Sequence, residues 1–185
     1  MPAYNVAVLV GSLRRDSLNR RMAHALARLA PERLALAEVP LGDLPLYNAD
    51  LEVEPPPASW TAFRERIRAA DAILFVTPEY NRSIPGVLKN AIDVGSRPGG
   101  KSVWARKPAA IVTVSPGALG GFGANHHLRQ MMVPLDVQVL AQPEAYVGGA
   151  GKAFDDAGEF TSEALRELMT KFLGAFADWI DRLKR

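Results

Sequence analysis

Four short apolar runs separated by helical patterns constrain the fold more than any other feature of this sequence. The runs cover residues 6–10, 34–39, 72–76 and 109–114, and residues 137–140 form a weaker fifth run. They are rich in branched residues and do not alternate between polar and apolar positions. Uninterrupted runs of this length are typical of strands that are covered on both faces.

Helical patterns fill the intervals between these runs. Their apolar residues recur three or four positions apart, which places them on one face of a helix. The pattern is longest near the C-terminus, where we interpret it as part of the core. Helices are expected at residues 18–29, 60–70, 85–96, 125–133 and 165–183.

Alternating strands and helices predict an α/β fold, a doubly wound parallel sheet with helices on both faces. Five strands favour the flavodoxin-like order 2-1-3-4-5. The chain has 185 residues, of which 48% are hydrophobic, enough for one well-cored domain and too few for two ordinary ones. We therefore expect residues 1–185 to form a single domain. Residues 41–57 end in three prolines and are expected to form an exposed connection.

Composition excludes several classes of function. The net charge is +2 and basic residues are mixed with acidic ones, so we expect no nucleic-acid partner. The chain has no cysteine, which excludes disulfides, thiol redox chemistry and thiolate metal sites. His126 and His127 are adjacent on an expected helix and point apart, so we predict no metal site. No apolar stretch is long enough to cross a bilayer and no secretory signal is apparent, which predicts a soluble, cytoplasmic protein.

The loop after the first apolar run carries groups that bind phosphate. Residues 11–19 combine a glycine with the hydroxyls of Ser12 and Ser17, the amide of Asn19 and the guanidinium of Arg14 ahead of a helix. The loop is neither a Walker loop nor a GxGxxG fingerprint. Taken alone, it is nearly as well explained by a turn, a helix cap and solvated arginines.

Two further loops follow the third and fourth apolar runs. Residues 77–83 contain a proline, a carboxylate, a phenol and a carboxamide, and residues 115–123 contain four glycines within seven positions. Either loop alone is adequately explained as a turn or a mobile surface loop. Parallel strands place their carboxyl ends at one edge, however, where open α/β sheets bind ligands. We therefore expect the three loops to form one site, which a flat ligand can approach closely at the glycines.

The residues of these loops resemble the NAD(P)H-dependent FMN reductase family, and in particular its bacterial chromate and quinone reductase branch. The resemblance spans nearly the whole chain in the right order. It rests on Gly11-Ser12-Leu13-Arg14 with Ser17 and Asn19, on Thr77-Pro78-Glu79-Tyr80-Asn81, on Ser83-Ile84-Pro85-Gly86, on Leu88-Lys89-Asn90-Ala91-Ile92-Asp93, and on Ser115 with Gly120-Gly121.

The resemblance implies a bound FMN, NADPH or NADH as co-substrate, and a small-molecule electron acceptor such as a quinone, an azo compound, a metal oxyanion or free flavin. It implies that the flavin performs the chemistry, so we expect no catalytic side chain. Members of the family are usually homodimers or homotetramers. The implied cofactor-binding residues are Ser12, Arg14, Ser17 and Asn19 at the phosphate, Pro78, Glu79, Tyr80 and Asn81 at the ring, and Ser115 and Gly117 at the polar edge of the ring.

Two alternative functions remain open at this point. A flavodoxin-like electron carrier would bind FMN without its own reaction with NAD(P)H. A regulatory domain of the same fold would bind no flavin. Arg82 stands where members of the family often carry Tyr or Val, and we interpret it either as a contact to the phosphates of the nicotinamide nucleotide or to a substrate, or as an exposed charge.

Overall fold

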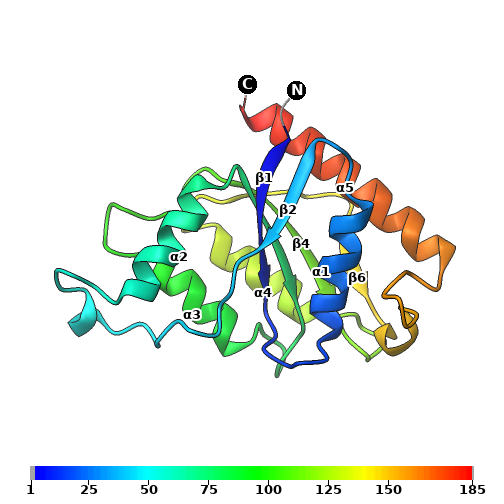
Figure 1. Ribbon diagram of the computed structural model, residues 1–185, viewed down its shortest axis with the longest axis horizontal. Helices are drawn as coiled ribbons and strands as arrows, with labels where there is room; N and C mark the ends of the chain where they lie inside the picture. The colour runs from blue at the N-terminus through cyan, green and yellow to red at the C-terminus, as the bar shows by residue number, and fades with distance from the viewer. Residues whose placement is uncertain (1–2, 185) are drawn as a thin grey trace.

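A parallel sheet of six strands forms the centre of the protein in the computed structural model, which describes residues 3–184 (Figure 1). The strand order is β2-β1-β3-β4-β5, and β6 also pairs with β4. This order confirms the predicted flavodoxin-like topology. The strands are β1 (Tyr4–Val10), β2 (Leu34–Glu38), β3 (Ala72–Thr77), β4 (Pro108–Val114), β5 (Gln138–Val139) and β6 (Ala145–Val147).

The fifth position of the sheet differs from the expected single strand. β5 is only two residues long and pairs with Pro108 and Ala109 at the start of β4. β6 pairs with the last three residues of β4, from Val112 to Val114. Two short segments therefore share the place of one strand, and β6 was missed because three residues are too few to form a recognisable pattern.

Five α-helices cover the sheet, with α1 and α5 on the right and α2 and α3 on the left in Figure 1. All five fall where helical patterns predict them. α4 begins three residues earlier than expected, after Gly121 in a left-handed conformation. The helices are α1 (Leu18–Leu29), α2 (Ala58–Ala69), α3 (Gly86–Gly95), α4 (Phe122–Met132) and α5 (Glu163–Lys184), with short 3-10 turns η1 (Ala49–Leu51) and η2 (Ala150–Lys152).

The strands read as uninterrupted apolar runs because each face of the sheet has its own core. Val6, Val8 and Val10 of β1 pack with α1 and α5, whereas Ala7 and Leu9 pack with α2, α3 and α4. Successive side chains of a strand point to opposite faces, so both sets must be apolar.

The connection between β2 and α2 is anchored from both sides. The buried amide of Asn90 on α3 accepts a hydrogen bond from Tyr47 N at 2.7 Å and donates to the carbonyl oxygens of Leu44 and Pro45. Arg64, only 4% exposed, donates two hydrogen bonds of 2.8 Å to the carboxylate of Glu52. The segment expected to be an exposed connection is therefore held against α2 and α3.

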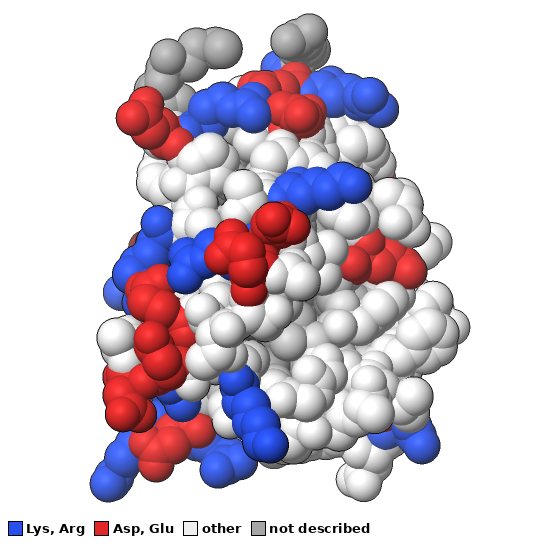
Figure 2. Space-filling view, turned by 90° about the vertical axis from the view of Figure 1, so that its right-hand side faces the viewer, with Lys and Arg blue, Asp and Glu red and all other residues white. Residues whose placement is uncertain are grey.

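Basic and acidic side chains lie next to one another on the face shown in Figure 2, and the lower right of that view carries few charges. This face has no extended stripe of one sign. No helix within residues 3–184 is long and apolar enough to cross a membrane.

Candidate active site at the carboxyl edge of the sheet

Three loops meet at the carboxyl ends of β1, β3 and β4 around a cavity of about 260 Å³. Eight of the ten residues predicted to bind a cofactor line it, whereas Asn81 and Gly117 do not. Leu18, Val114 and Pro116 complete the wall. The lining residues from the prediction are Ser12, Arg14, Ser17, Asn19, Pro78, Glu79, Tyr80 and Ser115.

The first loop brings buried polar groups to one end of this cavity. Ser12, Ser17 and Asn19 are each at most 4% exposed, while Arg14 is exposed at the rim. Ser17 caps α1 by accepting a hydrogen bond from Arg20 N at 3.3 Å. At the start of the loop, a Cβ on Gly11 would lie 2.3 Å from Thr77 Oγ1, so only glycine lets β1 and β3 approach this closely.

Asn19 indicates that the cavity is built for a ligand. Its Nδ2 donates to the carbonyl of Val114 at 3.4 Å, but its buried Oδ1 has no hydrogen-bond partner among residues 3–184. Buried polar groups in folded proteins nearly always have a partner. A ligand rich in hydroxyl and phosphate groups fits this end of the cavity, because it offers Asn19 a partner and meets the serine hydroxyls and the free amides ahead of α1.

The second loop is a tight turn at the end of β3. Tyr80 and Ser83 exchange two backbone hydrogen bonds of 2.8 and 3.0 Å. The two residues between them, Asn81 and Arg82, have φ values of 50° and 64°. Both central positions of a type I′ turn require positive φ, a conformation that asparagine tolerates well. The turn keeps Asn81 outside the cavity wall and exposes 49% of Tyr80 at the cavity mouth.

Glu79 joins this second loop to helix α4. Its Oε2 accepts a hydrogen bond from the backbone amide of Ala124, in the first turn of α4, at 3.0 Å. A carboxylate is favoured there by the free amides and the dipole of the helix. A Cβ on Gly123 would lie 3.0 Å from the same oxygen, so the close approach depends on glycine. Glu79 therefore holds the loop in place in addition to lining the cavity.

The third loop is fixed by β6 and η2. Ser115 N donates to Val147 O at 2.9 Å, and its carbonyl accepts from Ala150 N at 3.1 Å. Gly120 has a φ of 59°, and a Cβ there would lie 2.8 Å from the backbone of Tyr146. Such contacts oppose the interpretation of this loop as a mobile surface segment, and they could not be foreseen without β6.

An aromatic cluster lies beside the third loop. Phe122 and His126 of α4 and Tyr146 of β6 contact one another, and Phe122 is 51% exposed. Burial, together with a hydrogen bond to Glu144, raises the pKa of Tyr146 to about 12. The phenol therefore stays neutral at physiological pH, where it lies 3.2 Å from His126 Nε2.

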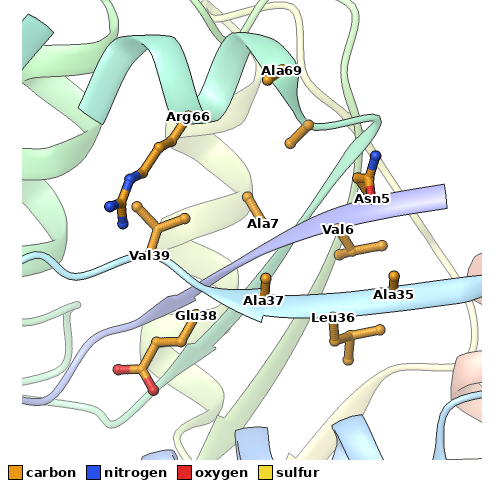
Figure 3. Close-up of a pocket in the computed structure, with 11 residues that line it drawn as sticks. Asn5, Val6, Ala7, Ala35, Leu36, Ala37, Glu38, Val39, Arg66 and Ala69 are labelled. Atoms are coloured by element: carbon orange, nitrogen blue, oxygen red, sulfur yellow. The ribbon is translucent and has the colours of Figure 1, made fainter. Parts of the chain in front are cut away.

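A larger cavity, of about 470 Å³, lies beside the edge strand β2 and is lined by residues of β1, β2 and the end of α2 (Figure 3). Its wall is mostly alanine and valine side chains, with Asn5, Glu38 and Arg66 as polar members. It lacks the convergent buried polar groups that fix a cofactor. We therefore assign the site to the smaller cavity. No cluster of residues that could hold a metal ion is found within residues 3–184.

Comparison with known proteins identifies the family. The sequence profile of the NADPH-dependent FMN reductase family matches residues 4–152, which include all three loops. The chain belongs to this family. Its FMN cofactor and its nicotinamide co-substrate, both implied by the sequence motifs, are thereby confirmed.

Individual relatives match over almost their full length. A quinone reductase of Pseudomonas putida is 59% identical over 96% of this chain and 95% of its own. A 2-hydroxy-1,4-benzoquinone reductase of Burkholderia is 47% identical over 96% and 97% of the two chains. The solved structure of FerB, a flavoenzyme NAD(P)H:acceptor oxidoreductase from Paracoccus denitrificans, matches with a TM-score of 0.92 and 41% identity, covering 97% of this chain and 98% of its own.

Proposed function

We propose that this FMN reductase family member passes electrons from NADPH or NADH through bound FMN to a quinone. The cavity at the carboxyl edge carries the proposal, because it gathers residues of all three motif loops around an unpartnered buried amide oxygen. The quinone reductases among the relatives support the choice of acceptor.

The ends of the cavity suit different parts of FMN. Ser12, Ser17, Asn19 and the rim guanidinium of Arg14 would bind the phosphate and the neighbouring hydroxyls. The loop with Pro78, Glu79, Tyr80 and Asn81 would lie along the ring, and Ser115 and Gly117 would meet its polar edge. Asn81 and Gly117 do not line the cavity, so we propose contact through their backbone or through a small shift of the loops.

The protein's part in the reaction is binding and orientation. When bound, FMN would supply the hydride and electron-transfer chemistry that protein side chains lack. Tyr80 lines the cavity and is 49% exposed, so we propose that nucleotide and acceptor approach the site in turn from its side. We propose no side chain as a general acid or base.

Anaerobic stopped-flow spectroscopy of the FMN-loaded protein tests the proposal. Mixing with NADPH or NADH is expected to bleach the flavin absorbance, and a quinone added afterwards is expected to restore it. A loaded protein that neither nucleotide bleaches would be an electron carrier. A protein that binds no FMN in a fluorescence titration would contradict the cofactor assignment as well.

We further propose a homodimer or homotetramer. Leu119 and Phe122, which are 62% and 51% exposed, lie close to the site and offer apolar area that a second subunit could cover. A cytoplasmic location suits both the requirement for reduced nicotinamide nucleotide and a chain without cysteine. A sizing column tests the oligomeric state, and steady-state rates with both nucleotides establish which is preferred.

A further inference from the structure

Arg20 lies in the first turns of α1 and holds the first loop from outside the cavity. Its Nη1 donates to the carbonyl oxygen of Arg14 at 3.1 Å, and its Nη2 donates to that of Ser12 at 3.4 Å. The side chain does not line the cavity. One guanidinium thus bridges two carbonyls of a loop whose other side faces the proposed phosphate site.

The loop has few other constraints. It is anchored at its start, where Gly11 N donates to Val76 O at 2.9 Å, and at its end, where Ser17 caps α1. Between these points, residues 15 and 16 form a turn, and within residues 3–184 the backbone of residues 12–16 makes no other hydrogen bond of 3.5 Å or less than those to Arg20. The path of the loop therefore depends on the two hydrogen bonds that Arg20 donates to its middle.

The two hydrogen bonds from Arg20 also orient backbone amides of the loop. In a planar trans peptide, the carbonyl of one residue and the N–H of the next point in opposite directions. Since the carbonyls of Ser12 and Arg14 point toward Arg20, the amides of Leu13 and Arg15 point away from it. Amides fixed in this manner bind an anion without first having to be ordered.

Glu38, at the end of β2, sets the position of Arg20. Its Oε1 accepts from Arg20 Nε at 3.1 Å, so all three nitrogens of the guanidinium are engaged. Figure 3 shows Glu38 on β2 among the residues that line the larger cavity. The carboxylate also balances the charge of Arg20, which leaves its guanidinium as a rigid fork of donors.

We propose that Arg20, oriented by Glu38, is a positioning residue that preorganises residues 11–17 for the phosphate of the cofactor. The proposal rests on the proposed function, because it takes this loop as the phosphate site. It goes beyond the family motif, in which neither residue takes part. It also makes a specific prediction, since a phosphate loop affects FMN but not riboflavin, which lacks the phosphate.

Fluorescence titration of apo-protein with FMN and with riboflavin tests the proposal in Arg20→Ala. Arg28→Ala is the matched control, because Arg28 lies on the same helix and also holds a glutamate and a carbonyl, those of Glu159 and Gly158, away from the loop. We expect Arg20→Ala to raise the Kd of FMN about tenfold, which matches the lower end of the range for one hydrogen bond from a charged donor. The Kd of riboflavin is expected to stay within about twofold of wild type, well below the tenfold step of a lost charged contact.

A second variant keeps the test decisive if Arg20→Ala folds poorly by circular dichroism. Arg20→Lys keeps the charge but cannot hold three acceptors in one plane, so it is expected to weaken FMN binding to an intermediate extent. Equal FMN affinity in the Arg20 variants and Arg28→Ala overturns the proposal, as does an equal loss for FMN and riboflavin. If the wild type itself binds no FMN, the proposed function fails first and this inference falls with it.

Discussion

Replacing Glu79 by alanine tests how the site is held together. The carboxylate is 13% exposed and joins the loop after β3 to the first turn of α4 through Ala124 N. A hydrogen bond to a charged group contributes about 1.5–3 kcal/mol to stability, and its removal leaves the amide of Ala124 without that partner. We therefore expect Glu79→Ala to lower the free energy of unfolding by about 1.5–3 kcal/mol.

Thermal unfolding of the apo-protein measures this loss directly. For a chain of this size, about 1 kcal/mol shifts the Tm by about 2–4 °C, so Glu79→Ala is expected to melt about 3–12 °C below wild type. Glu79→Gln keeps an oxygen acceptor but loses the charge that favours the helix N-terminus, so its Tm is expected to lie between the two. Apo-protein is used so that loss of cofactor binding does not enter the comparison.

Arg82→Ala provides the control for the exposed partner of Glu79. The Arg82 side chain is 76% exposed and its Nη1 lies 3.3 Å from Glu79 Oε1. An exposed pair of this kind contributes less than about 1 kcal/mol. If Glu79→Ala melts at the same temperature as wild type or Arg82→Ala, the bond to α4 does not hold the loop and the reasoning is refuted.

Two other perturbations test the frame around the site. Asn90→Ala removes three hydrogen bonds to the backbone of the connection between β2 and α2. It should lower the free energy of unfolding, measured with guanidinium chloride, by about 2–3 kcal/mol. Faster protease cleavage within residues 41–57 should accompany it, and unchanged cleavage would contradict the anchoring role. Burial acts to raise the pKa of Asp71, but hydrogen bonds from Lys184 and from Asn5 N outweigh it and lower the pKa below the usual 3.8. The Asp71 carboxylate therefore stabilises the folded protein fully above pH 3.8, and this stabilisation is lost as the pH falls through the lower pKa of the folded state. Urea midpoints between pH 2 and 7 should fall less steeply with acid in Asp71→Asn than in wild type, and parallel curves would contradict the assignment.

The sheet order could be predicted because β1, β3 and β4 are buried on both faces over most of their length, and the partly exposed edge strand β2 still forms an apolar run. Residues such as Val8 and Leu9 face different cores, so the run has no polar interruption and its length alone marks a strand. The fifth position of the sheet has no apolar run of comparable length. β5 and β6 together hold five paired residues, separated by a polar segment, and only their pairing with opposite ends of β4 defines them as strands.

The loops of the site could be predicted because topology alone brings strand ends together. The contacts that hold them could not, because they join residues that no local pattern relates. Glu79 and Ala124 lie 45 positions apart, and Asn90 and Leu44 lie 46 apart. Arg20 is close in sequence to the loop it holds, but an arginine in the first turns of a helix is ordinarily a solvated residue. Its role depends on Glu38, whose position requires the pairing of β1 with β2.

These contacts divide the site into two sets of residues with different energetic roles. Asn19 and Ser12 line the cavity, and the one side-chain hydrogen bond that Asn19 donates, to Val114 O, is long at 3.4 Å, so changes at both residues should act on ligand affinity more than on folding. Arg20 and Glu79 bond to the backbone of the loops or of α4, so changes there act on loop position first. Ser17 belongs to both sets, because it lines the cavity and caps α1 with the same hydroxyl. If the cavity binds the FMN phosphate as proposed, we therefore expect Ser17→Ala to weaken both ligand binding and the capping of α1.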